Sequence, residues 1–317
     1  MKTLSVVVPM YNEEEMIPLF FEKMNDIFSK ITNYNCEYVL VNDGSKDKTL
    51  ELLKEYKTKQ DNIHIVSFSR NFGQEPAVAA GVKYATGDLV VVMDCDFQDP
   101  PELIFDLLKK YEEGYLVVNA HRVDRSSDSF LKRFTAESFY KIIYKLSGKI
   151  KVPNNVGNYR LIDRKVVDEV NALTEKNRIF RVEVPYVGHK TATVDFVRAP
   201  RPKGETKYNY KSMFNLAEDF IASSSVEPLK FSFKFGIACT FINLILFIAS
   251  IVLFIVNENL HFYAQGTLLF LALMIIFSIF FALGIACVFI GINGMYLARI
   301  NKESIDRPAY IVDEYLK

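Results

Sequence analysis

The sequence lacks tryptophan altogether, has only four cysteines among its 317 residues, and carries no formal net charge. The cysteines, Cys36, Cys95, Cys239 and Cys287, are scattered, without a C-x-x-C pair or a neighbouring histidine cluster. This spacing argues against a disulfide framework or a zinc site and favours a reducing, cytosol-facing location. The 38 basic residues balance the 38 acidic ones. The basic excess of a general nucleic-acid binder is therefore absent, and no nucleic-acid partner is expected.

Half of the residues are apolar, a share too high for a disordered chain, and two long stretches contain no charged residue. The first is Phe235–Asn257 (23 residues) and the second is Gly266–Ala298 (33 residues). A bilayer core of ~30 Å requires about 20 helical residues, so each stretch is long enough to cross a membrane. The sequence predicts a two-helix transmembrane anchor over residues 235–298. The alternative is two buried helices in a soluble core.

The flanks of these stretches predict their orientation. Basic residues lie before the first stretch (Lys230, Lys234) and after the second (Arg299, Lys302, Arg307), whereas residues 258–265 contain neither lysine nor arginine. By the positive-inside rule both flanks face the cytoplasm. The N-terminal segment lacks the apolar core of a signal peptide. We therefore expect the N-terminal part of the chain and a C-terminal tail, residues 299–317, to be cytoplasmic.

Residues 1–211 are predicted to form one α/β domain, because short β-branched runs alternate with amphipathic helical patterns. The expected strands are residues 4–9, 38–42, 63–69 and 89–94, and the expected helices are residues 14–31, 48–57 and 76–86. The strands are continuously apolar, which is typical of a parallel sheet covered on both faces.

Two further segments have the pattern of helices that lie against a membrane. Between Asp128 and Leu146, apolar residues recur near helical spacing among lysines and arginines. This pattern fits either a surface helix packed on the sheet or a helix in the headgroup layer, and the nearby anchor favours the second. Residues 212–234 are predicted to form a juxtamembrane amphipathic helix by the same reasoning.

The segment VVVMDCDFQDPPE, residues 90–102, contains most of the chemical information. An apolar strand ends there in acidic residues, and ligands of open α/β sheets bind at the carboxyl ends of strands. In an extended segment Asp94, Asp96 and Gln98 point to one side and can share a divalent cation. Oxygen ligands favour Mg²⁺ or Mn²⁺. The sequence therefore predicts a metal site, the alternative being a polar turn after the strand.

Polar residues also follow the first two expected strands, as PMYNEEE from Pro9 and NDGSKD from Asn42. Tyr11 can stack on a base, and Asp43 can accept a hydrogen bond from a ring N–H or a ribose hydroxyl. The N-D-G-S sequence by itself is an ordinary turn pattern. Its alignment with two other polar strand ends favours a nucleotide site.

These segments resemble glycosyltransferase family 2 with the GT-A fold, and within it the polyprenyl-phosphate hexosyltransferases, such as dolichol-phosphate mannose synthase and the bacterial GtrB-type enzymes. The resemblance covers nearly the whole chain. It rests on VVPMYNEEE, VNDGSKD, SRNFGQEPAVAAG, MDCDFQDPPE, AHRVDRSSDSFLKR, NVGNYRLIDR, RAPRPKGETKYNY, the two apolar stretches and the tail RPAYIVDEYL. It implies a Rossmann-like, mostly parallel sheet in the catalytic domain.

The resemblance also implies roles for the matching residues. They are nucleotide contacts from Pro9, Tyr11, Glu13 and Asp43; metal contacts from Asp96 and Gln98, with Asp94 nearby; and contacts to the diphosphate or the acceptor phosphate from Arg122, Arg201 and Lys207. Independently, residues 198–211 hold five cations against one acid, and residues 122–133 hold four against two. Guanidinium groups bind phosphate oxygens bidentately, so both segments are candidate anion sites. The alternative is solvated loops attracted to anionic headgroups.

The chain departs from the family pattern at two positions. Asn42 stands where many relatives have aspartate, which is tolerable if Asp43 makes the critical contact. Asn158 stands where GtrB-type relatives commonly have aspartate, and an amide cannot act as a general base. A phosphate monoester with a second pKa near ~6 is already largely anionic at neutral pH, so we expect Asn158 to place the acceptor rather than deprotonate it. Asp163 is a less favoured candidate for a basic role.

The sequence therefore predicts a metal-dependent, inverting hexosyltransferase of a bacterial cytoplasmic membrane. The donor is a nucleotide diphosphate sugar, UDP-glucose or UDP-N-acetylglucosamine, and the acceptor is undecaprenyl phosphate at the cytoplasmic leaflet, giving a β-linked product. A separate flippase and a downstream transferase are expected, because the apolar stretches lack the ionisable groups of transport paths. Gly284, Gly291 and Gly294 allow close helix contacts and predict a homo-oligomer.

On sequence grounds one alternative function is disfavoured and a second stays open. A processive polysaccharide synthase requires a Q-x-x-R-W motif, which a chain without tryptophan cannot contain. A membrane-anchored scaffold or regulatory subunit with a decayed transferase site would accommodate Asn158. Transfer activity distinguishes the scaffold from the enzyme.

Overall fold

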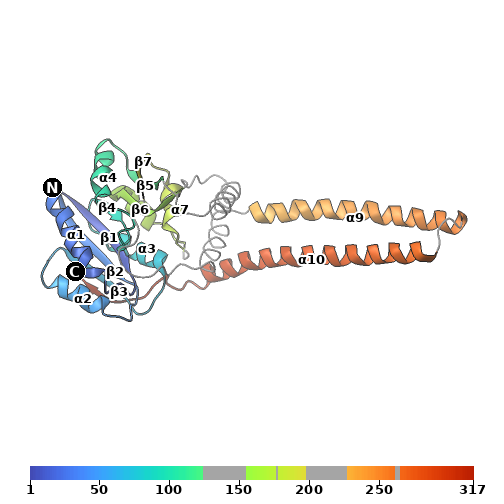
Figure 1. Ribbon diagram of the computed structural model, residues 1–317, viewed down its shortest axis with the longest axis horizontal. Coiled ribbons are helices and arrows are strands. Elements are labelled where there is room, and N and C mark those ends of the chain that lie inside the picture. Colours follow the sequence, from blue (N-terminus) through green and yellow to red (C-terminus); the bar gives the residue numbers. More distant parts are fainter. Residues whose placement is uncertain (124–154, 176–177, 198–226, 261–264) are drawn as a thin grey trace. The chain divides into compact units, whose positions relative to one another are not determined.

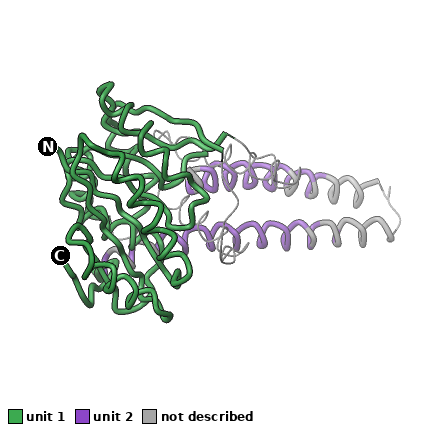
Figure 2. Tube along the Cα trace, turned by 60° about the vertical axis from the view of Figure 1, so that its left-hand side comes forward, with its two compact units in different colours: residues 1–145, 149–220, 306–317 green, residues 146–148, 221–305 purple. Residues whose placement is uncertain are grey.

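The computed structural model describes residues 1–123, 155–175, 178–197, 227–260 and 265–317, which form two compact units (Figure 2). Unit 1 contains the described residues of 1–197 together with 306–317, and unit 2 contains the described residues of 227–305. The predicted helices over residues 128–146 and 212–226 lie outside the described residues. The chain therefore leaves unit 1 and returns to it at its C-terminal end.

Unit 1 is built on an eight-stranded sheet in the order β7-β5-β6-β4-β1-β2-β3-β8 (Figure 1). The strands are β1 (Lys2–Met10), β2 (Tyr34–Asn42), β3 (Ile63–Phe68), β4 (Leu89–Val92), β5 (Val117–Arg122), β6 (Val156–Asp163), β7 (Thr191–Phe196) and β8 (Val312–Leu316). Strands β1 to β5 and β7 run in one direction, whereas β6 and β8 run against their neighbours. The prediction of an α/β fold with a mostly parallel sheet is confirmed.

Helices cover both faces of this sheet. They are α1 (Ile17–Lys30), α2 (Thr49–Lys57), α3 (Gln74–Tyr84), α4 (Leu103–Glu112), α6 (Arg164–Asn171) and α7 (Phe180–Val187). Apolar side chains of α1, α2 and α4 share one buried cluster with one face of the sheet, and those of α3, α6 and α7 share a second cluster with the other face. Successive residues of a strand point to opposite faces, which explains why Val6, Val7 and Val8 of β1 are all fully buried.

Helix α3 approaches the sheet closely because it carries a glycine at the contact. A Cβ atom on Gly81 would lie 2.2 Å from Cγ1 of Val7 and 3.1 Å from Cγ2 of Val41. No side chain fits in that space without moving β1 or β2. The glycine therefore fixes the distance between α3 and the strands whose ends carry the polar residues discussed below.

The predicted elements differ from the observed ones mainly at their ends. Strand β4 ends at Val92, two residues before the predicted end. Strand β2 begins at Tyr34, four residues before the predicted start. Helix α1 begins at Ile17, after a turn that the sequence pattern assigned to the helix.

The last strand of the sheet comes from the C-terminal end of the chain. Strand β8 pairs antiparallel with β3, with Ser67 opposite Glu314 and Phe68 opposite Val312. The sequence analysis treated residues 299–317 as a tail, and the structure divides this segment at residue 306. Residues up to Ser304 belong to the last helix, and residues 306–317 complete the sheet of unit 1.

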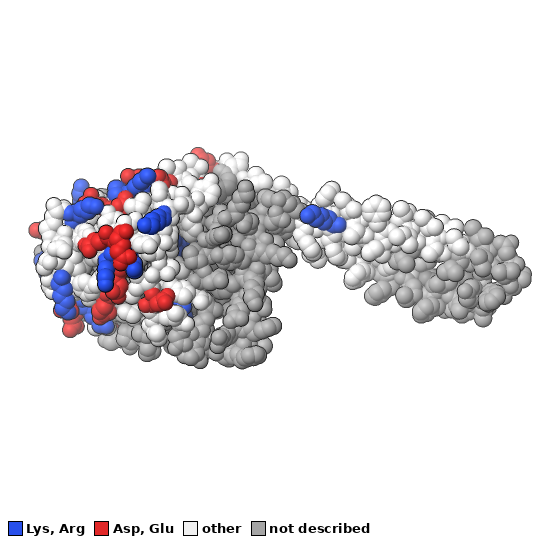
Figure 3. Space-filling model, turned by 90° about the horizontal axis from the view of Figure 1, so that it is seen from above, with Lys and Arg blue, Asp and Glu red and all other residues white. Residues whose placement is uncertain are grey.

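Unit 2 consists of two long helices, α9 (Glu227–Leu260) and α10 (Gln265–Ser304). Both predicted apolar stretches are helical, and residues 227–234 of the predicted juxtamembrane helix belong to α9. Among the described side chains, Ser278–Ala298 is the one helical stretch long and apolar enough to cross a membrane, with a mean hydropathy of 2.0 and none of it buried. A shorter apolar stretch covers Phe231–Ile245. Figure 3 shows charged side chains spread over unit 1 and few on the described part of unit 2.

Candidate active site

The candidate site lies at the carboxyl-terminal edge of the parallel strands. Because β1, β2, β4 and β5 run in the same direction, the residues at their ends share one edge of the sheet. The predicted residues found there are Pro9 at the end of the β1 ladder, Tyr11 and Glu13 after β1, Asp43 after β2, Asp94, Asp96 and Gln98 after β4, and Arg122 at the end of β5. The predicted Arg201 and Lys207 lie outside the described residues.

Strand β6 brings Asn158 to the same edge. Its antiparallel pairing with β4 puts Arg160 opposite Val92. Asp94 lies two residues after Val92, and Asn158 lies two residues before Arg160. Because the two strands are antiparallel, continuing the same register places Asp94 and Asn158 at the same level of the sheet. The structure thus brings Asn158 toward the acidic segment, from which it is separated by more than 60 residues in the sequence.

Asp43 is almost fully buried, with 3% of its surface exposed, and it holds the loop that follows β3. Its Oδ1 accepts a hydrogen bond from the backbone N–H of Phe72 at 2.7 Å, and its Oδ2 accepts from that of Gly73 at 2.9 Å. The side-chain amide of Asn71 donates to Oδ2 at 2.8 Å. Burial raises the pKa of Asp43 to about 6, although the two backbone bonds act in the opposite direction.

The loops after β1 and β2 are joined by hydrogen bonds that fix the expected nucleotide contacts. The backbone N–H of Asn12 donates to Oγ of Ser45 at 3.0 Å, and that of Glu13 donates to Oγ1 of Thr49 at 2.9 Å. In return Oδ1 of Asn12 accepts from the backbone N–H of Lys46 at 2.8 Å. Asn12 has a φ of 51°, a left-handed conformation that asparagine tolerates better than most residues.

Both polar atoms of the buried Asn42 side chain form a hydrogen bond. Its Nδ2 donates to Oγ of Ser67 at 2.9 Å, and its Oδ1 accepts from the backbone N–H of Ser45 at 3.2 Å. A carboxylate at this position would have no proton to donate to Ser67, although a serine hydroxyl can reverse its role. The asparagine therefore suits its buried surroundings.

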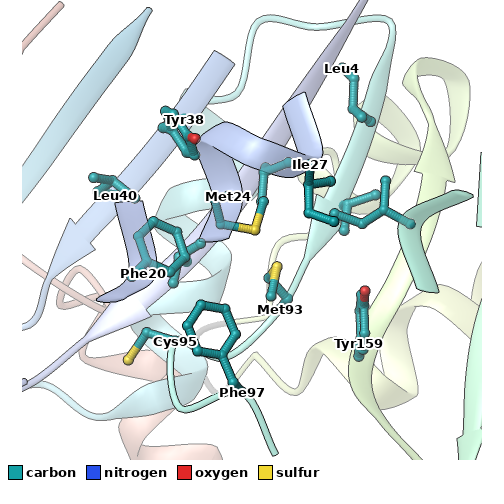
Figure 4. Close-up of a cluster of buried hydrophobic side chains, with 14 of the residues drawn as sticks. Leu4, Phe20, Met24, Ile27, Tyr38, Leu40, Met93, Cys95, Phe97 and Tyr159 are labelled. Atoms are coloured by element: carbon teal, nitrogen blue, oxygen red, sulfur yellow. The ribbon is translucent and has the colours of Figure 1, made fainter. Parts of the chain in front are cut away.

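The acidic segment after β4 is a turn rather than an extended strand, which corrects the prediction. Phe97 has a φ of 52°, and the side chains of Cys95 and Phe97 are buried under α1 (Figure 4). The ring of Phe97 stacks on that of Phe20, with centroids 6.1 Å apart. This packing turns the backbone, yet Asp94, Asp96 and Gln98 still lie on the more exposed side, in alternation with the two buried residues.

The donor set of this turn suits a hard divalent cation. Within the described ranges no group of three His, Cys, Asp and Glu side chains is close enough to hold a metal ion. Asp94, Asp96 and Gln98 offer oxygen atoms only, which Mg²⁺ and Mn²⁺ prefer. Mg²⁺ usually binds through one or two carboxylates together with phosphate oxygens of a substrate. The residues fit a metal that is completed by a diphosphate, rather than an all-protein site.

Two residues that the sequence analysis did not single out, Gln74 and Glu75, begin helix α3 at this edge. The side-chain amide of Gln74 donates to Oδ1 of Asp94 at 2.9 Å. The carboxylate of Glu75 accepts from Nδ2 of Asn158 at 3.3 Å and from the backbone N–H of Phe180 at 3.0 Å. The N-terminal turn of α3 therefore connects the acidic segment with Asn158. Both residues lie in the motif SRNFGQEPAVAAG, and membership of this motif is the one sequence feature that pointed to them.

A buried guanidinium lies beside Asn158. Arg160 is 1% exposed, and burial, assisted by the nearby Arg181, lowers its pKa to about 9 while Glu75 acts in the opposite direction. It therefore stays charged at neutral pH. Its Nη2 donates to the carbonyl of Gly157 at 2.8 Å, whereas Nε and Nη1 have no hydrogen-bond partner in the described part of the chain.

Asp163, the less favoured candidate for a basic role, is a structural residue. It caps helix α6 by accepting from the backbone N–H of Lys165 at 2.9 Å, and its other oxygen accepts from the hydroxyl of Tyr111 at 2.9 Å. It lies five residues beyond Asn158 in β6, or about 17 Å along the strand. Asp163 is thus at the opposite edge of the sheet, and the prediction of a basic role is wrong.

Known proteins are similar to this chain over nearly its whole length. The sequence model of glycosyl transferase family 2 matches residues 5–170. The bactoprenol glucosyl transferase of Shigella phage SfV is 39% identical over 313 residues, which cover 98% of this chain and 97% of that protein. The prophage bactoprenol glucosyl transferase homolog of Escherichia coli (strain K12) is 38% identical over 314 residues, covering 99% of each.

Two other similarities are to a further bacterial relative and to a solved structure. The uncharacterized glycosyltransferase YkcC of Bacillus subtilis (strain 168) is 39% identical over 310 residues, covering 98% of this chain and 93% of that protein. The crystal structure of glucosyl-3-phosphoglycerate synthase from Mycobacterium tuberculosis with Mg²⁺ and UDP is 20% identical, covers 70% of this chain and 77% of that chain, and has a TM-score of 0.46. This last likeness is too low to carry a functional argument.

Proposed function

Because the chain belongs to glycosyl transferase family 2, we propose that it transfers a hexose from a nucleotide diphosphate sugar to a polyprenyl phosphate. The observation that carries this proposal is the similarity to two bactoprenol glucosyl transferases over nearly the full length of all three proteins. Both relatives carry bactoprenol in their names, which supports a lipid acceptor. The candidate site supports a nucleotide donor, since its polar residues lie where α/β sheets bind such ligands.

The full proposal names both substrates and the stereochemistry. The donor is UDP-glucose or UDP-N-acetylglucosamine, and the names of the two relatives favour glucose. The acceptor is undecaprenyl phosphate at the cytoplasmic leaflet. Its phosphate oxygen attacks the anomeric carbon opposite the departing diphosphate, so the configuration inverts and the product is a β-linked lipid phosphate sugar.

The loops after β1 and β2 form the proposed nucleotide site. Pro9 lies at the end of β1, and Tyr11 and Glu13 lie on the first loop. This loop is joined to the second by the hydrogen bonds of Asn12. Asp43 already accepts three hydrogen bonds from residues 71–73. A carboxylate offers about four acceptor positions, so about one remains for a ring N–H or a ribose hydroxyl of the donor.

The proposed cation is Mg²⁺ or Mn²⁺, held by Asp94, Asp96 and Gln98. When bound, such an ion supplies positive charge next to a leaving diphosphate. Gln74 fixes the orientation of Asp94 through their hydrogen bond. Arg122, Arg201 and Lys207 are proposed to neutralise the phosphates, because a guanidinium group matches phosphate oxygens bidentately.

Asn158 is the proposed placing residue for the acceptor side. An ionised carboxylate only accepts hydrogen bonds, so the contact with Glu75 fixes the amide group of Asn158 with its Nδ2 toward that carboxylate. The second N–H of Nδ2 remains to donate to an acceptor oxygen. The acceptor phosphate is largely anionic at neutral pH, so this arrangement needs no general base at position 158.

The return of the chain to unit 1 supports a membrane anchor with two spans. Residues 312–316 pair with β3, so residues 197 and 306 must lie on the same side of any membrane. The number of crossings between them is therefore even. If Ser278–Ala298 crosses the bilayer, as its length and exposed apolar surface favour, a second crossing is required. We assign it to α9, with unit 1 and both termini in the cytoplasm.

Transfer with purified full-length protein tests the proposal. Labelled UDP-glucose and undecaprenyl phosphate are incubated with Mn²⁺, the wild-type protein and two variants. We expect labelled lipid from wild type and from Asp61→Ala, whose exposed aspartate precedes β3 at the opposite edge, and none from Asp96→Ala. Absence of transfer with a full panel of donors, despite UDP binding, would favour the scaffold and contradict the proposal. The homo-oligomer, the flippase and the downstream transferase stay predictions.

A further inference from the structure

The C-terminal segment, residues 310–316, lies along β3 as far as the start of the loop that follows β3. Residues 71–73 of this loop donate hydrogen bonds to Asp43. Tyr310 comes six residues after the last residue of α10. The pairing of β8 with β3 includes Phe68 opposite Val312, and the backbone N–H of Ser69 donates to the carbonyl of Ile311 at 3.1 Å. The segment therefore follows β3 to its carboxyl end, which leads directly into residues 71–73.

Three aromatic rings continue this contact to the loop itself. The ring of Tyr310 stacks on that of Phe68, with centroids 4.9 Å apart and an interplanar angle of 13°. The ring of Phe68 meets that of Phe72 edge-on at 5.7 Å and 88°. Phe72 is also the residue whose backbone N–H donates to Oδ1 of Asp43 at 2.7 Å. Each residue in this series thus touches the next, from the C-terminal segment to the buried carboxylate.

We propose that Tyr310 is a positioning residue for the nucleoside diphosphate part of the donor. It holds Phe68 and Phe72 in place, and Phe72 in turn keeps the backbone N–H groups of residues 72 and 73 on Asp43. The inference rests on the proposed function, in which Asp43 contacts the nucleotide. The chain segment that follows the last helix of unit 2 would thereby set the affinity of the donor site.

A plain stabilising role is the competing explanation. An added edge strand protects the backbone groups of β3 and stabilises the sheet as a whole, and any residue of β8 would then contribute in a similar way. Tyr315 provides the comparison for Tyr310, because it lies within β8, five residues further along the chain, and also contacts an aromatic ring. The centroid of its ring lies 4.7 Å from that of Tyr84. Tyr84 is the last residue of α3, whereas the first residues of α3 lie at the carboxyl edge of the sheet.

Nucleotide binding by the full-length protein tests the proposal. The dissociation constant for UDP with Mn²⁺ is measured by calorimetry, together with the melting temperature and the donor KM and kcat. Aromatic pairs contribute about 0.5–1.5 kcal/mol, so we expect Tyr310→Ala to weaken UDP binding about twofold to tenfold. Donor KM should rise by a similar factor, with kcat within about twofold of wild type. Tyr310→Phe retains the stacked ring and should bind UDP as wild type does.

Matched variants make each outcome decisive. Tyr315→Ala should leave UDP binding unchanged even if it lowers the melting temperature. If Tyr310→Ala does not fold, Tyr310→Leu keeps apolar volume without the stacked ring and replaces it. The positioning role alone is overturned if Tyr310→Ala and Tyr315→Ala weaken UDP binding equally. It is also overturned if Tyr310→Ala leaves UDP binding unchanged while Asp43→Asn weakens it. Unchanged UDP binding in Asp43→Asn contradicts the proposed nucleotide site itself.

Discussion

Replacement of Asp43 by asparagine perturbs the proposed donor site with the smallest change in shape. The wild-type carboxylate accepts from the backbone N–H groups of Phe72 and Gly73 through different oxygens. Asparagine has one oxygen and one NH₂ group in their place. Whichever way the amide turns, one of the two backbone N–H groups then faces another donor. If the NH₂ group takes the place of Oδ2, the side-chain amide of Asn71 also loses that acceptor.

The expected cost follows from these contacts. A buried donor left without a partner costs about 1–3 kcal/mol. In addition, each remaining hydrogen bond weakens, because a bond to a charged acceptor contributes about 1.5–3 kcal/mol and a bond to a neutral acceptor contributes roughly 1 kcal/mol. The neutral amide offsets part of this, because burial of the charge raises the pKa of Asp43 to about 6. We expect the free energy of unfolding to fall by about 1–3 kcal/mol. For a domain of this size that lowers the melting temperature by about 2–12 °C.

Thermal unfolding and UDP binding of Asp43→Asn measure both consequences in one preparation. Asp61→Asn, with its exposed side chain, is the control for the loss of one acidic group. We expect Asp43→Asn to melt earlier than the control and to bind UDP more weakly, because the 71–73 loop is no longer held. A variant that melts within 1 °C of the control and binds UDP normally would refute the reasoning.

Five further predictions concern the same edge of the sheet. Gly44 has a φ of 61° and a Cβ there would lie 2.2 Å from the backbone of Arg70, so Gly44→Ala should lower the melting temperature and raise donor KM. Donor KM should rise as the pH falls below about 6, where Asp43 becomes protonated. Because the folded pKa exceeds the ordinary 3.8, the contribution of this group to stability falls as the pH rises from about 4 to 6, which pH-dependent unfolding measures. Glu75→Gln should lower kcat several-fold with little change in UDP affinity, because Asn158 loses its fixed orientation. Removal of divalent cations by a chelator should abolish transfer, and added Mn²⁺ should restore it.

The sequence predicted the central strands and the edge that carries the site. Continuous runs such as VVV in β1 and VVV in β4 are buried on both faces, and this pattern depends only on local composition. The polar residues at the strand ends are equally local features. Their arrangement at one edge follows from the parallel direction of the strands, so it could be inferred from the sequence alone.

Other features depend on contacts between distant segments. Strand β8 is five residues long and contains two acids, so its pattern does not distinguish it from a solvated tail. The turn after β4 arises because Cys95 and Phe97 pack under α1, which no spacing rule reveals. Gln74 and Glu75 are ordinary polar residues of a helix start until β4 and β6 place Asp94 and Asn158 beside them.

Identification of the lipid product tests the proposed transfer most directly. Purified full-length protein is incubated with α-linked UDP-glucose, undecaprenyl phosphate and Mn²⁺, and the extracted lipid is analysed by mass spectrometry and by the anomeric coupling in its NMR spectrum. We expect undecaprenyl phosphate carrying one hexose in the β configuration, formed by wild type and not by Asp96→Ala. Free glucose without a lipid product, or a product that Asp96→Ala forms equally well, would contradict the proposed function.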